Sequence, residues 1–404
     1  MSSRDRVRLA FAHEEPDRVP LFEIHVDTKP ASEILGHWAP IGYSGATSKF
    51  QTEMAMAGKV EEFQEIHMNG RLELIRAVGQ DVLRAFPFRV DAPKPERITD
   101  DLWRFPYVVD GHALNVWCAD KKKQREYWST YKFVEETDSW IEVDSSVAHG
   151  GMQQFEQMLQ DLEERGPSMD GISFRNIEWA LQTAPDICVM GWADIPFFPG
   201  NSWTSIFFEA MAGRPDLMDR WFAAQRKQIL LMLEEQLKRG ANLILGGQDF
   251  CDTRGPTISP RHYRRWFQPF LLEITALCHR YGVPYLRHND GKPGILEETF
   301  LLESGIDGWH AIEPNAGNDI FYFKKKYGDR ITLAGNVDCA VTLVTGTPEE
   351  VYNEARDKIL GCAPGGGYML SSSNTIHNGV PARNYLAMVA AWRDFGNYPI
   401  RKRE

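Results

Sequence analysis

From residue 186 onward the sequence alternates strand-like runs with helical patterns, and this regular alternation leaves few folds open. The strand-like runs begin near Ile187, Leu243, Tyr285, Trp309, Ile331 and Tyr368. Helical patterns lie between them, at residues 225–239, 267–282, 318–327, 348–360 and 381–394. Such alternation implies parallel strands joined by right-handed helical crossovers. With two further strand-like segments, at residues 19–27 and 79–86, the pattern predicts an α/β fold of eight units, a (β/α)8 TIM barrel.

Residues 95–145 depart from this alternation. Two apolar and aromatic runs, 103–109 and 112–117, flank Asp110-Gly111, a pair that is typical of a tight hairpin turn. We therefore expect an inserted β-hairpin region at about 95–145, in the N-terminal half of a single domain that spans residues 1–404. A doubly wound open sheet is the alternative fold, but no G-x-G-x-x-G follows an early strand and no G-x-x-x-x-G-K-[ST] occurs.

Composition restricts the partners and the compartment. A net charge of −11 disfavours nucleic acid, because a protein that binds phosphates needs a basic face. No apolar run approaches the roughly 18 residues of a membrane helix, and the charged start holds no apolar segment long enough for a signal peptide. The six cysteines lie far apart with no C-x-x-C pair, which favours reduced thiols over a disulfide framework. We expect a cytoplasmic protein without a nucleic-acid or membrane partner.

Polar side chains gather where the expected strands end. The run from Tyr285 leads straight into His288-Asn-Asp290-Gly, and side chains repeat every second residue in a strand, so His288 and Asp290 point the same way. Similar residues close the other strands: His25, Asp249, Asp252, His310, Glu313, Asn336, Asp338 and Asn374. Helix capping is the alternative explanation for any one of them, notably Asp290, Asp338 and Asn374. As a set at the carboxyl ends of barrel strands, they predict a polar active site.

An ordered series of motifs over almost the whole chain resembles the uroporphyrinogen decarboxylase superfamily. The series comprises Arg4-Asp-Arg-Val-Arg-Leu-Ala-Phe with Pro16-Asp-Arg-Val-Pro, Ile258-Ser-Pro-Arg-His-Tyr-Arg, His288-Asn-Asp-Gly, Gly305-Ile-Asp-Gly-Trp-His-Ala-Ile-Glu-Pro, Ala316-Gly-Asn-Asp-Ile, Lys326-Tyr-Gly-Asp-Arg, Gly335-Asn-Val-Asp, Gly346-Thr-Pro-Glu-Glu-Val and Gly365-Gly-Gly-Tyr-Met-Leu-Ser-Ser-Ser-Asn. The resemblance implies a (β/α)8 barrel and two branches of activity, namely porphyrinogen decarboxylases and corrinoid-dependent methyltransferases.

Two departures from the family patterns favour the methyltransferase branch, of an O-demethylase type. Where the decarboxylases are expected to carry an Arg-Gln-Ala-Gly-Arg type loop, this chain has the acidic segment 23–30, which would repel a polycarboxylate substrate. The methyltransferases often bind zinc through His-x-Cys and a later Cys. Here Asp290 stands at the first Cys position, and Ser373 or Asn374 at the second. Zinc remains the candidate metal, held by His288 and Asp290 in an oxygen-rich site.

The resemblance and the residues together predict methyl transfer from a small methoxylated donor, with an aromatic ether as the expected class, to a Co(I) corrinoid carried by a separate protein. We assign catalytic roles to His288, Asp290, His310, Glu313 and Asp338, with a third metal ligand from Asp252, Glu313 or Asp338. Without a metal, His310 or a protonated Glu313 is the candidate acid. Substrate-binding roles go to His25, Asp249, Asp252, Trp192, Phe198, Trp203, Asn336 and Asn374.

Two other functions stay open at this point. One is a uroporphyrinogen-decarboxylase-type lyase, and the other is a barrel that binds a tetrapyrrole without catalysis. Cys251 and Cys339 also stand at strand ends, so a thiolate ligand is an alternative to an all-oxygen set. A homodimer is one oligomeric state that we consider.

Overall fold

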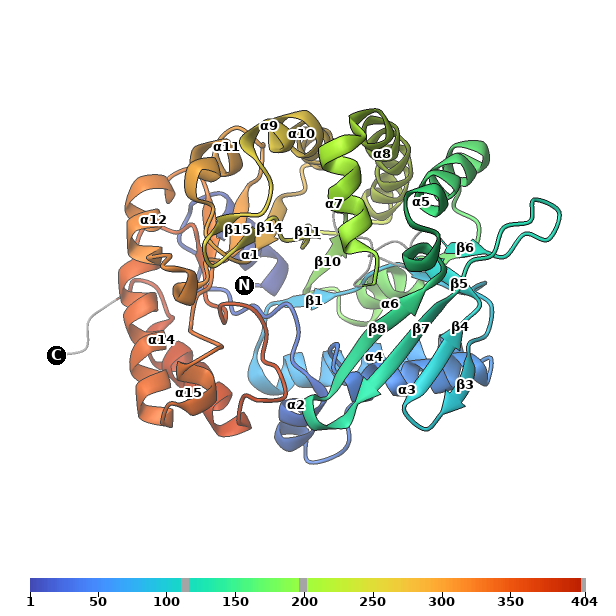
Figure 1. Cartoon of the computed structure of the whole chain (residues 1–404). Helices are drawn as coiled ribbons and strands as arrows, with labels where there is room; N and C mark the ends of the chain where they lie inside the picture. The colour runs from blue at the N-terminus through green and yellow to red at the C-terminus, as the bar shows by residue number, and fades with distance from the viewer. Residues whose placement is uncertain (110–115, 196–201, 401–404) are drawn as a thin grey trace.

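A computed structural model describes residues 1–109, 116–195 and 202–400 (Figure 1). Its centre is a curled sheet of seven parallel strands in the order β1-β10-β11-β14-β15-β16-β17. The strands are β1 (Val82–Arg84), β10 (Cys188–Trp192), β11 (Leu243–Gly246), β14 (Tyr285–Asn289), β15 (Gly308–Ala311), β16 (Thr332–Ala334) and β17 (Tyr368–Met369). This arrangement confirms the α/β class and the parallel strand order, and it is consistent with a TIM-like barrel.

The expected first strand, at residues 19–27, is reduced to isolated bridges. Leu21 pairs in parallel with Leu370, beside β17, and its carbonyl accepts a bond from the amide of Asp81, beside β1 (2.8 Å). The segment thus lies between the two edges of the seven-stranded sheet. Pro20 has no N–H, and the amide of Leu21 donates to the side chain of Asp81 (2.9 Å) and not to a neighbouring strand. These two features keep the ladder too short for a regular strand.

Helices surround the sheet on its outer side (Figure 1). They are α2 (Thr28–Leu35), α3 (Gly45–Met56), α4 (Val60–Val78), α5 (Ser146–Arg165), α6 (Arg175–Thr183), α7 (Thr204–Gly213), α8 (Pro215–Lys238), α9 (Pro260–His262), α10 (Gln268–Arg280), α11 (Glu297–Leu301), α12 (Ile320–Tyr327), α13 (Thr342–Thr345), α14 (Pro348–Cys362) and α15 (Ala382–Phe395). The start of α14 follows its sequence: Thr347 and Glu350 form a capping box around Pro348. No helix in the described ranges is both long and apolar enough to cross a membrane.

The first helix, α1 (Ser3–Phe11), covers the amino-terminal ends of the strands. The carbonyl of Ala10 accepts a bond from the Thr332 hydroxyl at the start of β16 (3.2 Å), and Arg6 forms a buried ion pair with Asp81, just before β1 (2.6 Å). Val7 and Ala10 pack with the inward-facing apolar residues of the sheet, which are Phe22, Val82, Cys188, Met190, Leu243, Leu245, Leu286, Ala334 and Met369. With this end covered, the carboxyl ends of the strands are where a site can open.

The predicted β excursion is confirmed. Residues 96–145 form an antiparallel sheet in the order β3-β4-β7-β8, made of β3 (Glu96–Thr99), β4 (Leu102–Phe105), β7 (Ser129–Val134) and β8 (Ser139–Ser145). A separate hairpin pairs β5 (Tyr107–Val109) with β6 (Val116–Cys118). The Asp110-Gly111 turn predicted for this hairpin lies outside the described residues. Two further short pairs join β2 (Phe88–Arg89) to β9 (Ile172–Ser173), and β12 (Cys251–Asp252) to β13 (Gly255–Pro256).

Candidate active site

Two histidines meet at the carboxyl ends of neighbouring strands. His288 in β14 stands directly opposite His310 in β15, and their Nδ1 atoms are 2.8 Å apart. Because side chains alternate along a strand, His288 points into the same interior as Leu286, two residues earlier. Both imidazoles are buried. Strand β14 therefore directs the His288 side chain into the interior of the curled sheet, as its sequence predicts.

A backbone carbonyl next to His310 determines which nitrogens of the two imidazoles carry protons. Nε2 of His310 lies 3.2 Å from the carbonyl of Ser372, which can only accept a hydrogen bond, so this nitrogen carries the hydrogen. Burial holds the pKa of His310 well below its usual range, so the ring is neutral and its Nδ1 is an acceptor. Nδ1 of His288 must then be the donor of the bond between the two rings. Nε2 of His288 is left facing the carboxylates beyond it.

Two carboxylates lie close to that nitrogen. Nε2 of His288 lies 3.6 Å from Oδ1 of Asp249 and 3.5 Å from Oδ1 of Asp290. One ligand atom from each of these residues falls within 4.8 Å of the other two. Oδ1 of Asp290 is buried without a hydrogen-bond partner among the described residues, while its Oδ2 accepts a bond from the amide of Asn374. One imidazole, two carboxylates and an orphaned oxygen are a donor set that fits a divalent cation such as zinc.

The charges in this cluster are coupled. Burial opposes the charged form of His288, but the carboxylates of Asp290 and Asp249 outweigh burial and raise its pKa to about 9. Burial also raises the pKa of Asp249, against the opposite effect of His288. Without a metal, His288 is therefore an imidazolium near neutral pH, with a proton on the nitrogen that faces the two acids.

Glu23 is a site residue that the sequence analysis missed. Its Oε1 accepts a bond from the amide of Ser372 (2.9 Å) and its Oε2 from the Ser372 hydroxyl (2.5 Å). The neighbouring Ser371 hydroxyl contacts Nε2 of His310 (3.1 Å) and Oε2 of Glu23 (3.5 Å). Burial raises the pKa of Glu23 to about 8. The strand-like segment at residues 19–27 carries Glu23 two positions before His25, which places both on one side of an extended chain, and this spacing was the signal for it.

The raised pKa of Glu23 predicts a loss of stability with rising pH. The folded state keeps the proton up to about pH 8, whereas the unfolded chain releases it near its ordinary value of 4.5. The folded state binds more protons in this window, so the contribution is full below it and is lost as the pH rises through it. One pKa unit corresponds to about 1.4 kcal/mol. Across this pH window, the unfolding free energy of the wild type should therefore fall by on the order of a few kcal/mol more than that of Glu23→Gln.

Urea unfolding at a series of pH values across this window measures the difference. Glu23→Gln keeps the shape of the side chain and removes its titration, so its unfolding free energy should change less with pH. Glu65→Gln, which alters an exposed carboxylate on α4, is the matched control and should follow the wild type. Parallel curves for Glu23→Gln and the wild type would contradict the prediction.

Several other predicted residues lie around this cluster. Asn374 holds Asp290, and Oε2 of Glu313 accepts a bond from the amide of Gly291 (2.9 Å), which fixes the turn after Asp290. The side-chain amide of Asn336 donates to the carbonyl of Ile312 (2.6 Å), and its Oδ1 has no partner among the described residues. Trp192, the last residue of β10, is buried beside Phe86 (ring centroids 6.5 Å apart).

The structure groups Asp249 with His288 and Asp290, and not one of the three acids predicted as the third metal ligand. Asp252 is bound by Arg254 and by the amide of Gly255 in its own turn, so its carboxylate is engaged away from His288. Asp338 accepts bonds from Asn315 and from the amides of Ala340 and Val341, so its carboxylate is engaged in the turn before α13. Glu313 holds the Gly291 amide. Asp249, which we had assigned to substrate binding, stands in their place because it follows β11, the neighbour of β14 in the sheet.

The predicted substrate-binding role of Trp203 is also corrected. Trp203 is fully buried in the core, packed against Phe155 (5.7 Å between ring centroids) and Trp221 (6.4 Å), so it does not face a substrate. Phe198 lies outside the described residues. The alternative of a thiolate ligand finds no support among the described residues, because Cys251 and Cys339 are absent from the metal-binding group. Burial raises their pKa values to about 12 and about 11.

The fold and the cluster define a barrel-like α/β protein with a polar, metal-competent centre at the carboxyl ends of its parallel strands. Comparison with known proteins narrows the class: residues 200–395 match the family described as uroporphyrinogen decarboxylase (URO-D). This match includes Asp249, His288, Asp290 and His310, and it supports the superfamily that the motifs resemble.

Individual proteins give the same picture. The uroporphyrinogen decarboxylase of Coxiella burnetii (strain Dugway 5J108-111) is 26% identical over 186 residues, which are 45% of this chain and 48% of that protein. That of Serratia proteamaculans is 26% identical over 171 residues, 40% and 44% of the two chains. The alignment thus spans about half the length of these curated relatives. A methyltransferase from Methanosarcina mazei superposes over 98% of this chain and 99% of its own, with a TM-score of 0.61 and 16% identity, a likeness of fold.

Proposed function

We propose that this protein is a methyltransferase that moves a methyl group from a small methoxylated aromatic donor to the Co(I) of a corrinoid carried by a separate protein. The observation that carries the proposal is the convergence of Asp249, His288 and Asp290 on one point, with His310 behind His288. The fold shared with a methyltransferase supports it. Zinc is the metal that we propose for the three side chains.

The chemical problem is the leaving oxygen. Attack on an ether methyl breaks its C–O bond, the electron pair stays on the oxygen, and a Co–C bond forms as Co(I) becomes methyl-Co(III). A phenolate leaving group has a conjugate acid with a pKa of about 10, so it needs a proton or a positive charge. A zinc ion held by Asp249, His288 and Asp290 would supply Lewis acidity at this oxygen.

The protein's own residues prepare the site for that step. Nε2 of His288 lies between two carboxylates, and its raised pKa places a proton there when no metal is bound, ready for the leaving oxygen. His310 fixes the orientation of the His288 ring through the 2.8 Å contact. Ser371, Ser372 and Glu23 in turn hold His310. This is the support that precise positioning of a reacting group requires.

The acidic surroundings argue against a decarboxylase that takes a polycarboxylate. Asp27, Asp249, Asp290 and Glu313 all lie on the segments that end at this side of the sheet. Their carboxylates would repel a substrate with many negative charges. The second alternative is a barrel that binds a tetrapyrrole without catalysis. Binding alone does not require the ordered hydrogen bonds that run from the Ser372 carbonyl through His310 to His288.

A spectroscopic screen tests the proposal. The protein is mixed with a Co(I) corrinoid protein and with methoxylated aromatics or methylamines, and the absorbance of methyl-Co(III) is followed. We expect the signal with a methoxyarene. Release of carbon dioxide from uroporphyrinogen, together with no methyl-Co(III) from any methoxylated donor, would instead support the lyase.

A further inference from the structure

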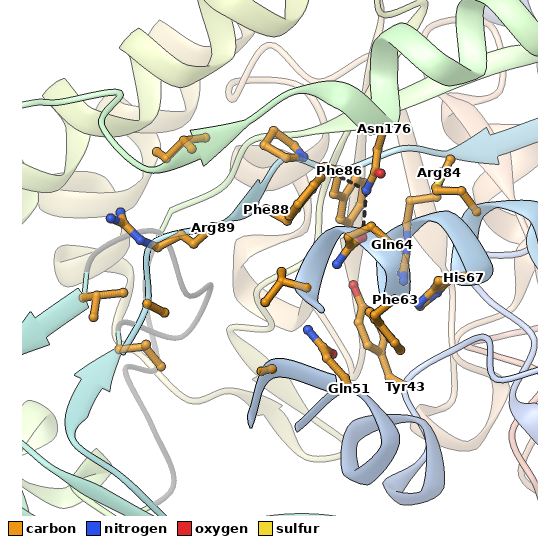
Figure 2. Close-up of a pocket in the computed structure, with 18 of the residues that line it drawn as sticks. Tyr43, Gln51, Phe63, Gln64, His67, Arg84, Phe86, Phe88, Arg89 and Asn176 are labelled. Atoms are coloured by element: carbon orange, nitrogen blue, oxygen red, sulfur yellow. Dashed lines mark hydrogen bonds between the residues drawn. The ribbon is translucent and has the colours of Figure 1, made fainter. Parts of the chain in front are cut away.

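A cavity of about 320 Å³ lies just beyond the carboxyl end of β1 (Figure 2). It is bounded by α3, α4, α6, the chain from β1 to β2, and the β5-β6 hairpin. Three arginines and one histidine line it, namely Arg71, Arg84, Arg89 and His67, and no described lining residue is Asp or Glu. Arg89 is paired with Asp91 (2.6 Å), so it is the charge of Arg71 and Arg84 that favours a negatively charged ligand in this cavity.

Arg84 is the central residue of this cavity. It follows Val82 by two positions, so it points into the interior at the carboxyl end of the sheet. Only 4% of it is exposed, yet its Nε and Nη2 have no hydrogen-bond partner among the described residues. The guanidinium lies over the rings of Tyr43 (4.2 Å) and Phe86 (4.8 Å), which hold it in place without neutralising it. Figure 2 shows Arg84 beside His67.

Two further basic side chains adjoin it. Nη1 of Arg71, on α4, donates to the carbonyl of Arg84 (3.0 Å), which brings the second guanidinium to the same place. Burial lowers the pKa of Arg71 to about 9, and the charge of Arg84 adds to this effect. His67 is 8% exposed and its Nε2 has no partner among the described residues. Burial keeps the pKa of His67 well below its usual range, so the positive charge here comes from the two arginines. A buried guanidinium with unused donors, such as that of Arg84, gains stability when an anion binds to it.

The rest of the lining fits a flat apolar body. Aromatic rings come from several elements, namely Tyr43, Phe63, Phe86, Phe88 and Tyr107. Asn176 is held by Gln64 (2.9 Å) and by the carbonyl of Phe86 (3.1 Å), so this polar wall is fixed (Figure 2). The volume is at the lower end of the roughly 300–1,000 Å³ that is common for small-molecule sites. A ligand with one aromatic ring suits it.

His25 joins this cavity to the histidine cluster. Its Nδ1 lies 3.4 Å from Nη1 of Arg84, and its ring packs edge-on against Tyr43. Burial, and then the charges of Arg84 and Arg71, keep the pKa of His25 well below its usual range, and His288 and His310 add smaller effects of the same sign. A narrower cavity of about 30 Å³ is lined by His25, Glu23, Arg71 and Arg84, among others.

We infer that Arg84 and Arg71, with His67, bind the carboxylate of a small aromatic acid whose ring lies among the aromatic side chains of this cavity. The identification of that acid as the methyl donor rests on the proposed function. The site would then select methoxylated aromatic carboxylates over neutral methoxyarenes. The two guanidinium groups supply donors in the geometry that suits a carboxylate.

Calorimetric titration of the whole protein tests this site without any methyl transfer. The ligands are benzoate, 3-methoxybenzoate and the neutral 3-methoxybenzyl alcohol. We expect both acids to bind at least ~10-fold more tightly than the alcohol, since hydrogen bonds to a charged group are strong. Equal affinity of the acid and the alcohol would overturn the inference. Binding of inorganic phosphate as tight as that of benzoate would overturn the assignment to an aromatic acid.

Variants locate the contact. Arg84→Gln and Arg71→Gln should each weaken binding of the acids at least ~10-fold and leave the affinity for the alcohol within about threefold. Arg76→Gln is the matched control, because Arg76 is an exposed arginine on the same helix as Arg71. Circular dichroism checks that each variant is folded. Unchanged acid binding in both Arg84→Gln and Arg71→Gln would overturn the inference. If a variant does not fold, the comparison of the acids with the alcohol in the wild type still tests it.

The same ligands separate this inference from the proposed function. If benzoate binds through Arg84 but 3-methoxybenzoate gives no methyl-Co(III), the anion site stands and the proposed function fails. If 3-methoxybenzyl alcohol and 3-methoxybenzoate donate their methyl groups with equal kcat/KM, the proposed function stands and the anion site fails.

Discussion

Replacing His288 with alanine is expected to lower the rate of methyl transfer at least ~1,000-fold, because it removes the residue that we propose as a metal ligand, or as the proton donor when no metal is bound. Nε2 of His288 lies between Asp249 and Asp290, and no other described imidazole shares that position. The unfolding free energy should fall by only about 1–3 kcal/mol, the amount expected when a buried partner such as His310 loses its hydrogen bond.

Three measurements on the purified variant check this result: single-turnover formation of methyl-Co(III), metal content and thermal unfolding. Metal content should fall from about one zinc per chain to well below that, since two carboxylates alone are a poor zinc site. His149→Ala is the control, because His149 is exposed and paired with Asp144 outside the cluster. A variant that is much less stable but turns over within tenfold of the wild type would assign His288 a structural role.

The sequence predicts what depends on local periodicity. The two-residue repeat placed His288 and Asp290 on one side of β14, and the structure has both at a common centre. The strand-helix alternation located all seven strands of the curled sheet. The segment at 19–27 has the same alternation, but Pro20 and the bond from Leu21 to Asp81 limit it to bridges. Periodicity does not predict which backbone amide will donate a hydrogen bond to a side chain that is distant in sequence.

What the sequence does not predict depends on which strands become neighbours. Asp249 and Asp338 look alike as acids at strand ends, yet only Asp249 follows a strand that pairs with β14. Arg71 resembles an ordinary charged residue of an amphipathic helix, and Arg84 an isolated cation in a short apolar run. Their proximity, and the lack of any acid beside them in the described lining, arises only when α4 packs near the end of β1. Trp203 is the converse case: the sequence predicted a substrate-binding role, but packing buries its side chain in the core.

The oxygen-rich centre leads to the second large effect: the protein should not methylate coenzyme M. A sulfur-rich zinc site passes electron density to a bound thiolate and keeps it nucleophilic, whereas carboxylate ligands preserve the Lewis acidity that an ether oxygen needs. Among the described residues, the group that could hold a metal ion consists of Asp249, His288 and Asp290, with no thiol. The Sγ of Cys339 accepts a bond from the Ser373 hydroxyl (3.3 Å), and burial raises the pKa values of Cys339 and Cys251 to about 11 and about 12.

The test incubates the protein with a methylated corrinoid protein and coenzyme M, and measures methyl-coenzyme M. We expect a rate below about 1% of the rate of methyl transfer from a methoxyarene, a difference of roughly 3 kcal/mol in activation free energy. Asp290→Cys restores a His-x-Cys pair and should raise zinc affinity while it lowers the rate with the methoxyarene, because a softer ligand weakens Lewis acidity. Asp329→Cys, at an exposed position away from the cluster, should change neither quantity. Rapid formation of methyl-coenzyme M by the wild type would show that the hardness of the metal ligands does not determine which methyl acceptor the protein uses. The argument for an oxygen-bound methyl donor would then fail.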